Sequence, residues 1–428
     1  MDKVPVSAWR PLLAGAEARE ALRLAHETGE RLRDAQRLGQ AIEAVSGHAA
    51  PTGYVYWEPA GLAQGHPGLA ILFAGLGWED AAHEQIELTV AVLRGGGPMR
   101  TGLHHGLAGI AFAARFVDGE RYERLLGTLD GLVDRRVTAI LTRLDERSGG
   151  CSEHEIDLIS GLAGIGAYLL VRGDSESLRP LLERLVGLLA ADTERPAWHT
   201  PQELLDDDSR ASYPRGGMNC GLAHGLPGPL ALLALASRAG VDVPGLEDSI
   251  RTGAEWLVEH ASADEWGPDW PYSVPVGGAG DTRPARAAWC YGAPGISRAL
   301  WLAGSALEDA SLRRFAVEAL EGVFERPRES LRMDGPAFCH GVAGVLQITS
   351  RMAADSGSER LRAAAERLCD ELVDRFDPGS LLGYRSLDPD GLAFDVAGLL
   401  DGAAGIALVL AAAGSPTEPG WDRAFLLD

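Results

Sequence analysis

The sequence of 428 residues predicts an all-α fold, a double-layered ring of seven inner and seven outer helices. A short Gly-x-x-Gly unit followed by an apolar run recurs along the whole chain, and amphipathic stretches with charged faces lie between the runs. Successive copies lie roughly 40 to 70 residues apart, so each is a supersecondary unit that cannot bury its own apolar face.

The repeated unit predicts the inner helices. Each run after it is rich in Leu, Ala and Ile and is apolar nearly all the way round, so we expect a helix buried on most sides. The seven copies are GHPGLAILFA from Gly65, GLAGIAFAA from Gly106, GLAGIGAYLL from Gly161, GLPGPLALLALA from Gly225, GAPGISRALWLA from Gly292, GVAGVLQI from Gly341 and GAAGIALVLAAA from Gly402.

The stretches between the runs predict the outer helices. Residues 18–38, 122–144 and 358–376 alternate charged and apolar positions with the spacing of partly solvated helices. An open solenoid normally needs polar caps at its ends, and the last inner run, GIALVLAAAG, has none. We therefore expect a closed ring and a single domain over residues 1–428.

Two longer insertions interrupt the repeats, around residues 193–218 and 262–285. Both are rich in Pro and Gly and contain Trp. Insertions in repeat proteins collect on one face, usually the binding face, so we expect these loops to line the substrate entrance.

Composition and charge exclude several classes of partner. The net charge of −22 and the isoelectric point near 4.9 predict repulsion from nucleic acid and from anionic membrane surfaces. Lys3 is the only lysine, which removes Schiff-base chemistry from the candidates. No signal peptide and no apolar run long enough for a membrane span is evident, so we expect a cytoplasmic protein.

The residues just before the first Gly of each copy form the candidate metal site. Cys290 stands there in copy five, and Cys339 with His340 in copy six. Equivalent positions in adjacent repeats lie at the same end of the ring, about one helix spacing apart. Two Cys and one His without a fourth protein ligand indicate a catalytic zinc with an open position, so we predict one Zn²⁺ ion per chain.

The remaining cysteines carry no such pattern. Cys151, Cys220 and Cys369 are scattered, and five cysteines are an odd number in a compartment where disulfides do not persist. An isolated buried Cys is usually an inert small apolar residue, and we interpret these three as structural or incidental. Zinc would hold a bound thiol as thiolate, and helix N-termini beginning at the repeated Gly would favour anions, so the pattern indicates thiol chemistry.

Four segments resemble the lanthionine synthetase C family of lanthipeptide cyclases. They are DLISGLAGIG (157–166), NCGLAHGLPG (219–228), RAAWCYGAPG (286–295) and FCHGVAGVL (338–346), and the resemblance runs from about Gly61 to Gly405. It implies an α/α toroid with one zinc ion that adds Cys thiols of a ribosomal peptide to dehydroalanine or dehydrobutyrine. The products would be the thioether rings of lanthionine and methyllanthionine.

The same resemblance assigns roles to individual residues. Cys290, Cys339 and His340 match the zinc ligands, and His224 matches the acid/base histidine. Arg286, Tyr291 and Asp157 match further positions of the family site. The addition needs a proton donor for the enolate carbon, which suits His224, and a donor for the enolate oxygen, which Arg286 or a helix N-terminus supplies.

Several roles stay open at this point. Asp157 either orients His224 or pairs with Arg286. An Asp157–Arg286 ion pair could also be purely structural. Tyr291 is equally explained as a packing residue. His104 and His105 stand at the ligand-equivalent places of copy two, and Asp401 at that of copy seven. We interpret them as a polar lining of the ring mouth, with proton transfer as the alternative.

Other functions fit parts of the pattern. The nearest alternative is a thiol-binding or glutathione-binding zinc protein, or another thiol-adding one, on the same toroid. A prenyltransferase would need an Asp among its zinc ligands and a partner subunit, and a glycosidase would need two facing carboxylates. A non-catalytic scaffold would not need the three ligands in one register. The cyclase reading implies a dehydrated precursor peptide as substrate and, because no kinase or lyase domain precedes the repeats, a separate dehydratase.

Overall fold

The computed structural model describes residues 9–46, 55–97, 99–146, 149–173, 175–190, 195–278, 280–387 and 391–428. Within these ranges the chain folds mainly into α-helices, with three short two-stranded sheets. It divides into two compact units. Unit 1 comprises residues 1–99, 113–123 and 332–421, and unit 2 comprises residues 100–112, 124–331 and 422–428.

Each of the seven repeated units begins an apolar helix in the described residues. These helices are α3 (His66–Gly75), α5 (Leu107–Asp118), α8 (Leu162–Arg172), α11 (Pro227–Arg238), α13 (Ala293–Ala306), α15 (Val342–Ser356) and α17 (Ala403–Gly414). They are buried along nearly their whole length, which confirms the predicted inner helices. None of the helices described is both long enough and apolar enough to cross a membrane.

Copy five shows why the unit needs two glycines. Gly292 precedes α13 with φ +78°, and a Cβ there would lie 2.2 Å from the carbonyl oxygen of Arg286. A Cβ on Gly295 would lie 2.4 Å from the carbonyl oxygen of Trp289 and 2.9 Å from Cβ of Leu222 in the preceding copy. The loop before the helix therefore folds back against the first helical turn, at a distance that only glycine allows.

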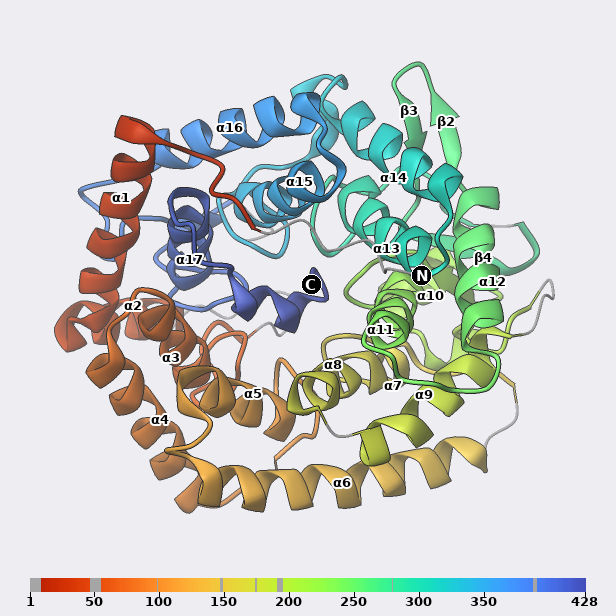
Figure 1. Ribbon diagram of the computed structural model, residues 1–428, viewed down its shortest axis with the longest axis horizontal. Coiled ribbons are helices and arrows are strands. Elements are labelled where there is room, and N and C mark those ends of the chain that lie inside the picture. The colour runs from red at the N-terminus through yellow and green to blue at the C-terminus, as the bar shows by residue number, and fades with distance from the viewer. Residues whose placement is uncertain are drawn as a thin grey trace. The chain divides into compact units, whose positions relative to one another are not determined.

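The charged stretches form the outer helices, as predicted. They are α1 (Gly15–Arg33), α4 (Glu79–Arg94), α6 (Glu123–Asp145), α9 (Ser175–Leu189), α12 (Leu246–Glu259), α14 (Ala310–Val323) and α16 (Glu359–Asp374). In unit 1, α1 packs on α17, α3 on α4 and α15 on α16; in unit 2, α8 packs on α9, α11 on α12 and α13 on α14 (Figure 1).

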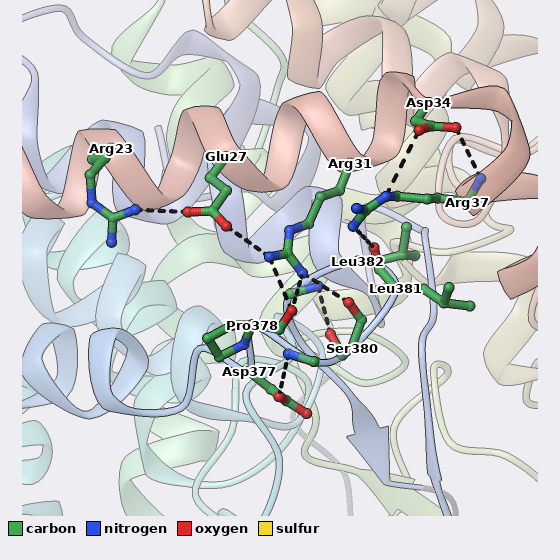
Figure 2. Close-up of polar contacts among 12 residues, drawn as sticks. Arg23, Glu27, Arg31, Asp34, Arg37, Asp377, Pro378, Ser380, Leu381 and Leu382 are labelled. Carbon is green, nitrogen blue, oxygen red and sulfur yellow. Dashed lines mark hydrogen bonds and ion pairs between the residues drawn. The ribbon is translucent and has the colours of Figure 1, made fainter.

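The predicted stretch 18–38 is divided between two helices. Asp34 leaves the helical conformation after α1, and its carboxylate accepts hydrogen bonds from the backbone N–H groups of Gln36 and Arg37 in α2 (Ala35–Ser46). A side-chain cap of this kind starts a new helix. Nearby, Arg31 pairs with Glu27 and donates to the carbonyl oxygen of Ser380, so α1 is fastened to the loop after α16 (Figure 2).

The two insertions meet each other in unit 2. Strand β1 (Gly217–Asn219) pairs antiparallel with β4 (Ser273–Pro275), with Asn219 opposite Ser273. The first insertion also contains α10 (Asp207–Ser212), and the second contains the hairpin of β2 (Ser262–Asp264) and β3 (Gly267–Asp269). Residues 193, 194 and 279 of the predicted insertions lie outside the described residues. In unit 1, β5 (Ser386–Leu387) pairs with β6 (Ala393–Phe394).

Residues 422–428 complete the core of unit 2. The indole N–H of Trp289 donates to the carbonyl oxygen of Phe425 at 3.2 Å, and the buried Arg298 donates through Nε to that of Leu427 at 2.8 Å. Phe425, Leu426 and Leu427 are themselves buried. A segment far away in sequence thus closes the packing around α13.

Candidate active site and metal ligands

Backbone hydrogen bonds hold the site-bearing loops of unit 2 in register. The N–H of His104 donates to the carbonyl oxygen of Ile159 at 3.0 Å, and that of Leu158 donates to the oxygen of Ala223 at the same distance. The N–H of Ala223 in turn donates to the oxygen of Cys290 at 3.3 Å. Copies two, three, four and five therefore present equivalent positions side by side.

Unit 1 shows the same arrangement in the other copies. The N–H of Cys339 donates to the carbonyl oxygen of Leu400 at 2.9 Å, and the N–H of Leu400 donates to the oxygen of Ala63 at 3.0 Å. Copies six, seven and one are linked as copies two to five are in unit 2. The repeat frame used to find the candidate residues is thus a physical register within each unit.

Asp157 is fixed at the start of copy three, between α7 (Glu153–Ile156) and α8. Its side chain is fully buried, and Oδ1 accepts hydrogen bonds of 2.7 Å from the backbone N–H groups of Ser160 and Gly161. Burial alone would raise the pKa of this carboxyl. Hydrogen bonds from His154, His224 and Ser160 outweigh that cost and hold the pKa of Asp157 at about 2, so it is a carboxylate at neutral pH.

His224 meets the other oxygen of the same carboxylate. Its Nδ1 lies 2.7 Å from Oδ2 of Asp157, while its side chain remains 28% exposed. An Nδ1–H bonded to a carboxylate leaves Nε2 of a neutral ring free to accept a proton. The sequence leaves two roles open for Asp157. The structure shows the hydrogen bond to His224, in which Asp157 orients the imidazole.

Tyr291 borders the histidine from copy five. Its ring centroid lies 6.5 Å from that of His224, and its hydroxyl accepts a hydrogen bond of 3.1 Å from Nδ2 of Asn219. Asn219 is held in turn, because its Oδ1 accepts the backbone N–H of Gly221 at 2.8 Å. Tyr291 is therefore both packed and positioned by a polar contact.

Arg286 joins this group through a second tyrosine. Its Nε donates to the hydroxyl of Tyr272 at 3.2 Å, and the ring of Tyr272 lies 4.9 Å from the ring of Tyr291. Arg286, Tyr291, His224 and Asp157 thus belong to one connected set of side chains in unit 2. The set offers a base, a fixed carboxylate and a permanent cation.

Sequence reasoning missed four members of this set: Glu153, His154, Asn219 and Tyr272. Asn219 could have been found, because it stands six residues before Gly225, as Arg286 stands six before Gly292. Tyr272 gives no such signal because it lies in an insertion. Glu153 hydrogen-bonds to Asn219, and burial raises the pKa of its carboxyl.

The predicted metal ligands are divided between the units. In unit 2, Cys290 is buried two residues before Gly292, the N-cap of α13. In unit 1, Cys339 and His340 precede Gly341, the N-cap of α15. Both sets stand at helix N-termini, where negative charge is favoured.

His340 has the surroundings of a metal-binding histidine. Its Nδ1 lies 3.8 Å from Oδ1 of the buried Asp401, which leaves Nε2 directed elsewhere. A carboxylate behind the ring is the usual arrangement for a zinc-binding imidazole. Cys290 and Cys339 form no disulfide bond within the described residues, and two Cys and one His are the residue types that bind zinc.

The structure contradicts the interpretation of His104 as part of a polar lining, because the residue is buried in the core. The ring is fully buried, its Nε2 lies 3.1 Å from the carbonyl oxygen of Ala424, and it packs against Trp289 and Phe425. Burial lowers the pKa of His104 to about 3, so the ring is neutral at physiological pH. His104 is a core residue because the segment 422–428, whose placement the sequence did not reveal, covers it.

The cysteines outside the candidate site are buried. Burial raises the pKa of Cys220 and of Cys369 to about 12, which keeps both as thiols. Cys151 is buried as well, and its sulfur contacts the carbonyl oxygen of Trp198. Cys220 and Cys369 therefore lack the environment of a reactive thiolate.

Comparisons with known proteins agree with the sequence resemblance. The family described as "Lanthionine synthetase C-like protein" matches residues 56–426. The nisin biosynthesis protein NisC of Lactococcus lactis subsp. lactis is 27% identical over 349 residues, which cover 75% of this chain and 82% of that protein. The solved structure of nisin cyclase matches with a TM-score of 0.73 and 24% identity, over 86% of this chain and 92% of that one. This likeness confirms the predicted fold class, the all-α toroid type.

Proposed function

The chain belongs to the lanthionine synthetase C-like family, and on that premise we propose that it is a zinc-dependent lanthipeptide cyclase. The proposed reaction is the intramolecular addition of a Cys thiol of a precursor peptide to dehydroalanine or dehydrobutyrine, which forms a lanthionine or methyllanthionine ring. The observation that carries the proposal is the hydrogen bond between His224 and Asp157, close to Tyr291, which directly follows Cys290 in the chain.

The reaction forms one carbon–sulfur bond and moves one proton. The thiol loses its proton to the base, the sulfur attacks the β-carbon of the alkene, the π electrons pass to the adjacent carbonyl as an enolate, and a proton returns to the α-carbon. The hydrogen bond between Nδ1 of His224 and Asp157 leaves Nε2 of the ring able to accept and donate that proton. The net reaction consumes no proton, so one imidazole that accepts and then donates suffices.

Arg286 is the proposed partner of the enolate oxygen. Its guanidinium carries a permanent charge, and the bond to Tyr272 limits the directions in which it points. A fixed cation stabilises charge that develops in the transition state. Tyr291 is proposed to contact the substrate, because the hydrogen bond from Asn219 fixes the position of its hydroxyl.

Cys290, Cys339 and His340 are the proposed ligands of one Zn²⁺ ion per chain. The ion would hold the substrate sulfur as thiolate at neutral pH. The fit is supported by the donor set and by the carboxylate of Asp401 behind the His340 ring. We also propose that residues 1–428 form a single domain with one such site.

The proposed partners follow from the reaction. The substrate is a precursor peptide that already contains dehydrated residues, and a separate dehydratase produces it. The proposed location is the cytoplasm, where the cysteines of such a peptide stay reduced.

The test is cyclisation of a dehydrated peptide by the purified, zinc-loaded chain, followed by mass spectrometry after thiol alkylation. We expect wild-type protein to protect the substrate thiols from alkylation and His224→Asn to leave them reactive. Binding of a thiol or glutathione without ring closure by the wild type would favour the alternative of a thiol-binding protein instead.

A further inference from the structure

A second histidine shares the carboxylate that orients His224. His154 lies on α7, one turn before Asp157, and its Nδ1 is 3.4 Å from the same Oδ2 that accepts His224 at 2.7 Å. The two imidazole rings meet edge to face with centroids 5.8 Å apart. The His154 side chain is 71% exposed, whereas Asp157 is fully buried.

We propose that His154 is a positioning residue that sets how readily His224 gains and loses a proton, because both rings compete for one oxygen of Asp157. The proposal rests on the proposed function for the role of His224 in cyclisation. The coupling between the two rings is a property of unit 2 alone.

The coupling follows from the charges. A protonated His154 offsets part of the negative charge of Asp157, so a proton on His224 is held less tightly. A neutral His154 leaves the whole carboxylate to His224, which then holds its proton more tightly. A ring that must both accept and donate a proton benefits from the first condition near neutral pH.

The groups around His154 favour its charged form. Its bond to Asp157 raises the pKa of His154, and the nearby Glu153 acts in the same direction, whereas Arg100 opposes it. Glu153 also faces His224, and burial raises the pKa of Glu153 itself. His154, exposed to solvent, therefore exchanges protons freely and stays charged to a higher pH than an isolated histidine.

Two other readings of the same cluster fit less well. His154, Asp157 and His224 have ligand atoms within 4.8 Å of one another and could hold a metal. Two ligands at about 2.0 to 2.1 Å from one tetrahedral zinc lie about 3.3 Å apart, whereas His224 and Asp157 are 2.7 Å apart, a hydrogen-bond distance. A proton relay through Asp157 is disfavoured because its pKa of about 2 keeps it ionised.

The first test is the pH profile of kcat/KM for cyclisation by full-length, zinc-loaded protein. In His154→Ala and His154→Gln the acidic limb should move to higher pH by about 0.5 to 1 unit, because the competing cation is gone. In His154→Arg, which keeps a charge there, the limb should stay at or below the wild-type position. His260→Gln is the control, since His260 stacks on Trp256 in unit 2 away from Asp157.

The second test needs no activity. The ring of His224, identified by comparison with His224→Asn, is titrated by NMR in each His154 variant. We expect its titration midpoint to move upward in His154→Ala and His154→Gln but not in His154→Arg or His260→Gln. Unchanged midpoints in all variants would overturn the proposal. A wild type without cyclase activity would overturn the proposed function, and the titration would still decide the coupling.

Discussion

Asp157 and His224 stand 67 residues apart in the chain, yet their side chains share a hydrogen bond of 2.7 Å because copies three and four of the repeat lie side by side. The same carboxylate also accepts hydrogen bonds from the backbone N–H groups of Ser160 and Gly161, the two residues before α8. One buried charge therefore serves the helix and the imidazole together.

Replacing that charge should disable His224 without unfolding the chain. In Asp157→Asn the amide can still accept at Oδ1, but its NH₂ group would donate to Nδ1 of His224 and favour the wrong tautomer. We expect kcat for cyclisation to fall about 10²- to 10⁴-fold. The double variant with His224→Asn should be no slower than His224→Asn alone, and additive losses would show that the two residues act separately.

We expect substitutions at the proposed metal site to weaken zinc binding to different degrees. Cys339→Ala should lose the ion, measured as metal content after dialysis, because one of three protein ligands is gone. Asp401→Ala should keep it but bind about 10- to 100-fold more weakly in competition with a chelator, since the Asp401 carboxylate lies 3.8 Å from Nδ1 of His340 and would close to a hydrogen bond when zinc occupies Nε2. Cys369→Ala is the control, and full zinc content in Cys339→Ala would refute the ligand assignment.

His104 predicts an acid-sensitive fold. Its pKa is about 3 in the folded protein and near 6.5 when unfolded, so between these values the unfolded state binds the extra proton. Stability contributed by the neutral ring is present above pH 6.5 and is lost as pH falls, by about 1.4 kcal/mol per pH unit.

The variant His104→Phe should show this contribution by difference. It loses the contact with Ala424 and is less stable at pH 7.5, but its free energy of unfolding should fall less steeply between pH 6.5 and 5. Equal slopes for wild type and variant in urea titrations would mean that His104 does not carry the effect.

The glycine before α13 predicts a large destabilisation. In Gly292→Ala the new Cβ would meet the Arg286 carbonyl oxygen at 2.2 Å, in a backbone conformation that is essentially restricted to glycine and itself costs about 1 to 3 kcal/mol. We expect at least about 3 kcal/mol in the free energy of unfolding. Gly187→Ala in α9, where nothing approaches within 4 Å, should be neutral or slightly stabilising; similar effects of both changes would contradict the close-approach argument.

The repeat made much of this structure predictable. All seven inner helices begin at or within two residues of the glycine units, because the unit encodes both a tight turn and an apolar helix. The same frame brought Asp157, His224, Arg286 and Tyr291 onto neighbouring loops. His224 and Tyr291 stand at equivalent positions of this frame, whereas Asp157 and Arg286 were named from the resemblance to the lanthionine synthetase C family.

Residues outside the frame could not be found in this way. Tyr272 reaches the site only because β4 pairs with β1, and no periodic signal announces a pairing of two insertions. His104 became a core residue because residues 422–428 cover it, a contact across 320 positions. His154 and Glu153 lie on a helix of four residues, α7, too short to show a hydrophobic period.

The place of residues 422–428 in the core has a consequence for biosynthesis. A ribosome that has translated copies two to five has still not made Phe425 and Leu427, whose carbonyl groups Trp289 and Arg298 bind. The packing around α13 is therefore completed only after residues 422–428 have been synthesised. A chain that lacks residues 422–428 would leave Trp289 and Arg298 without these hydrogen bonds.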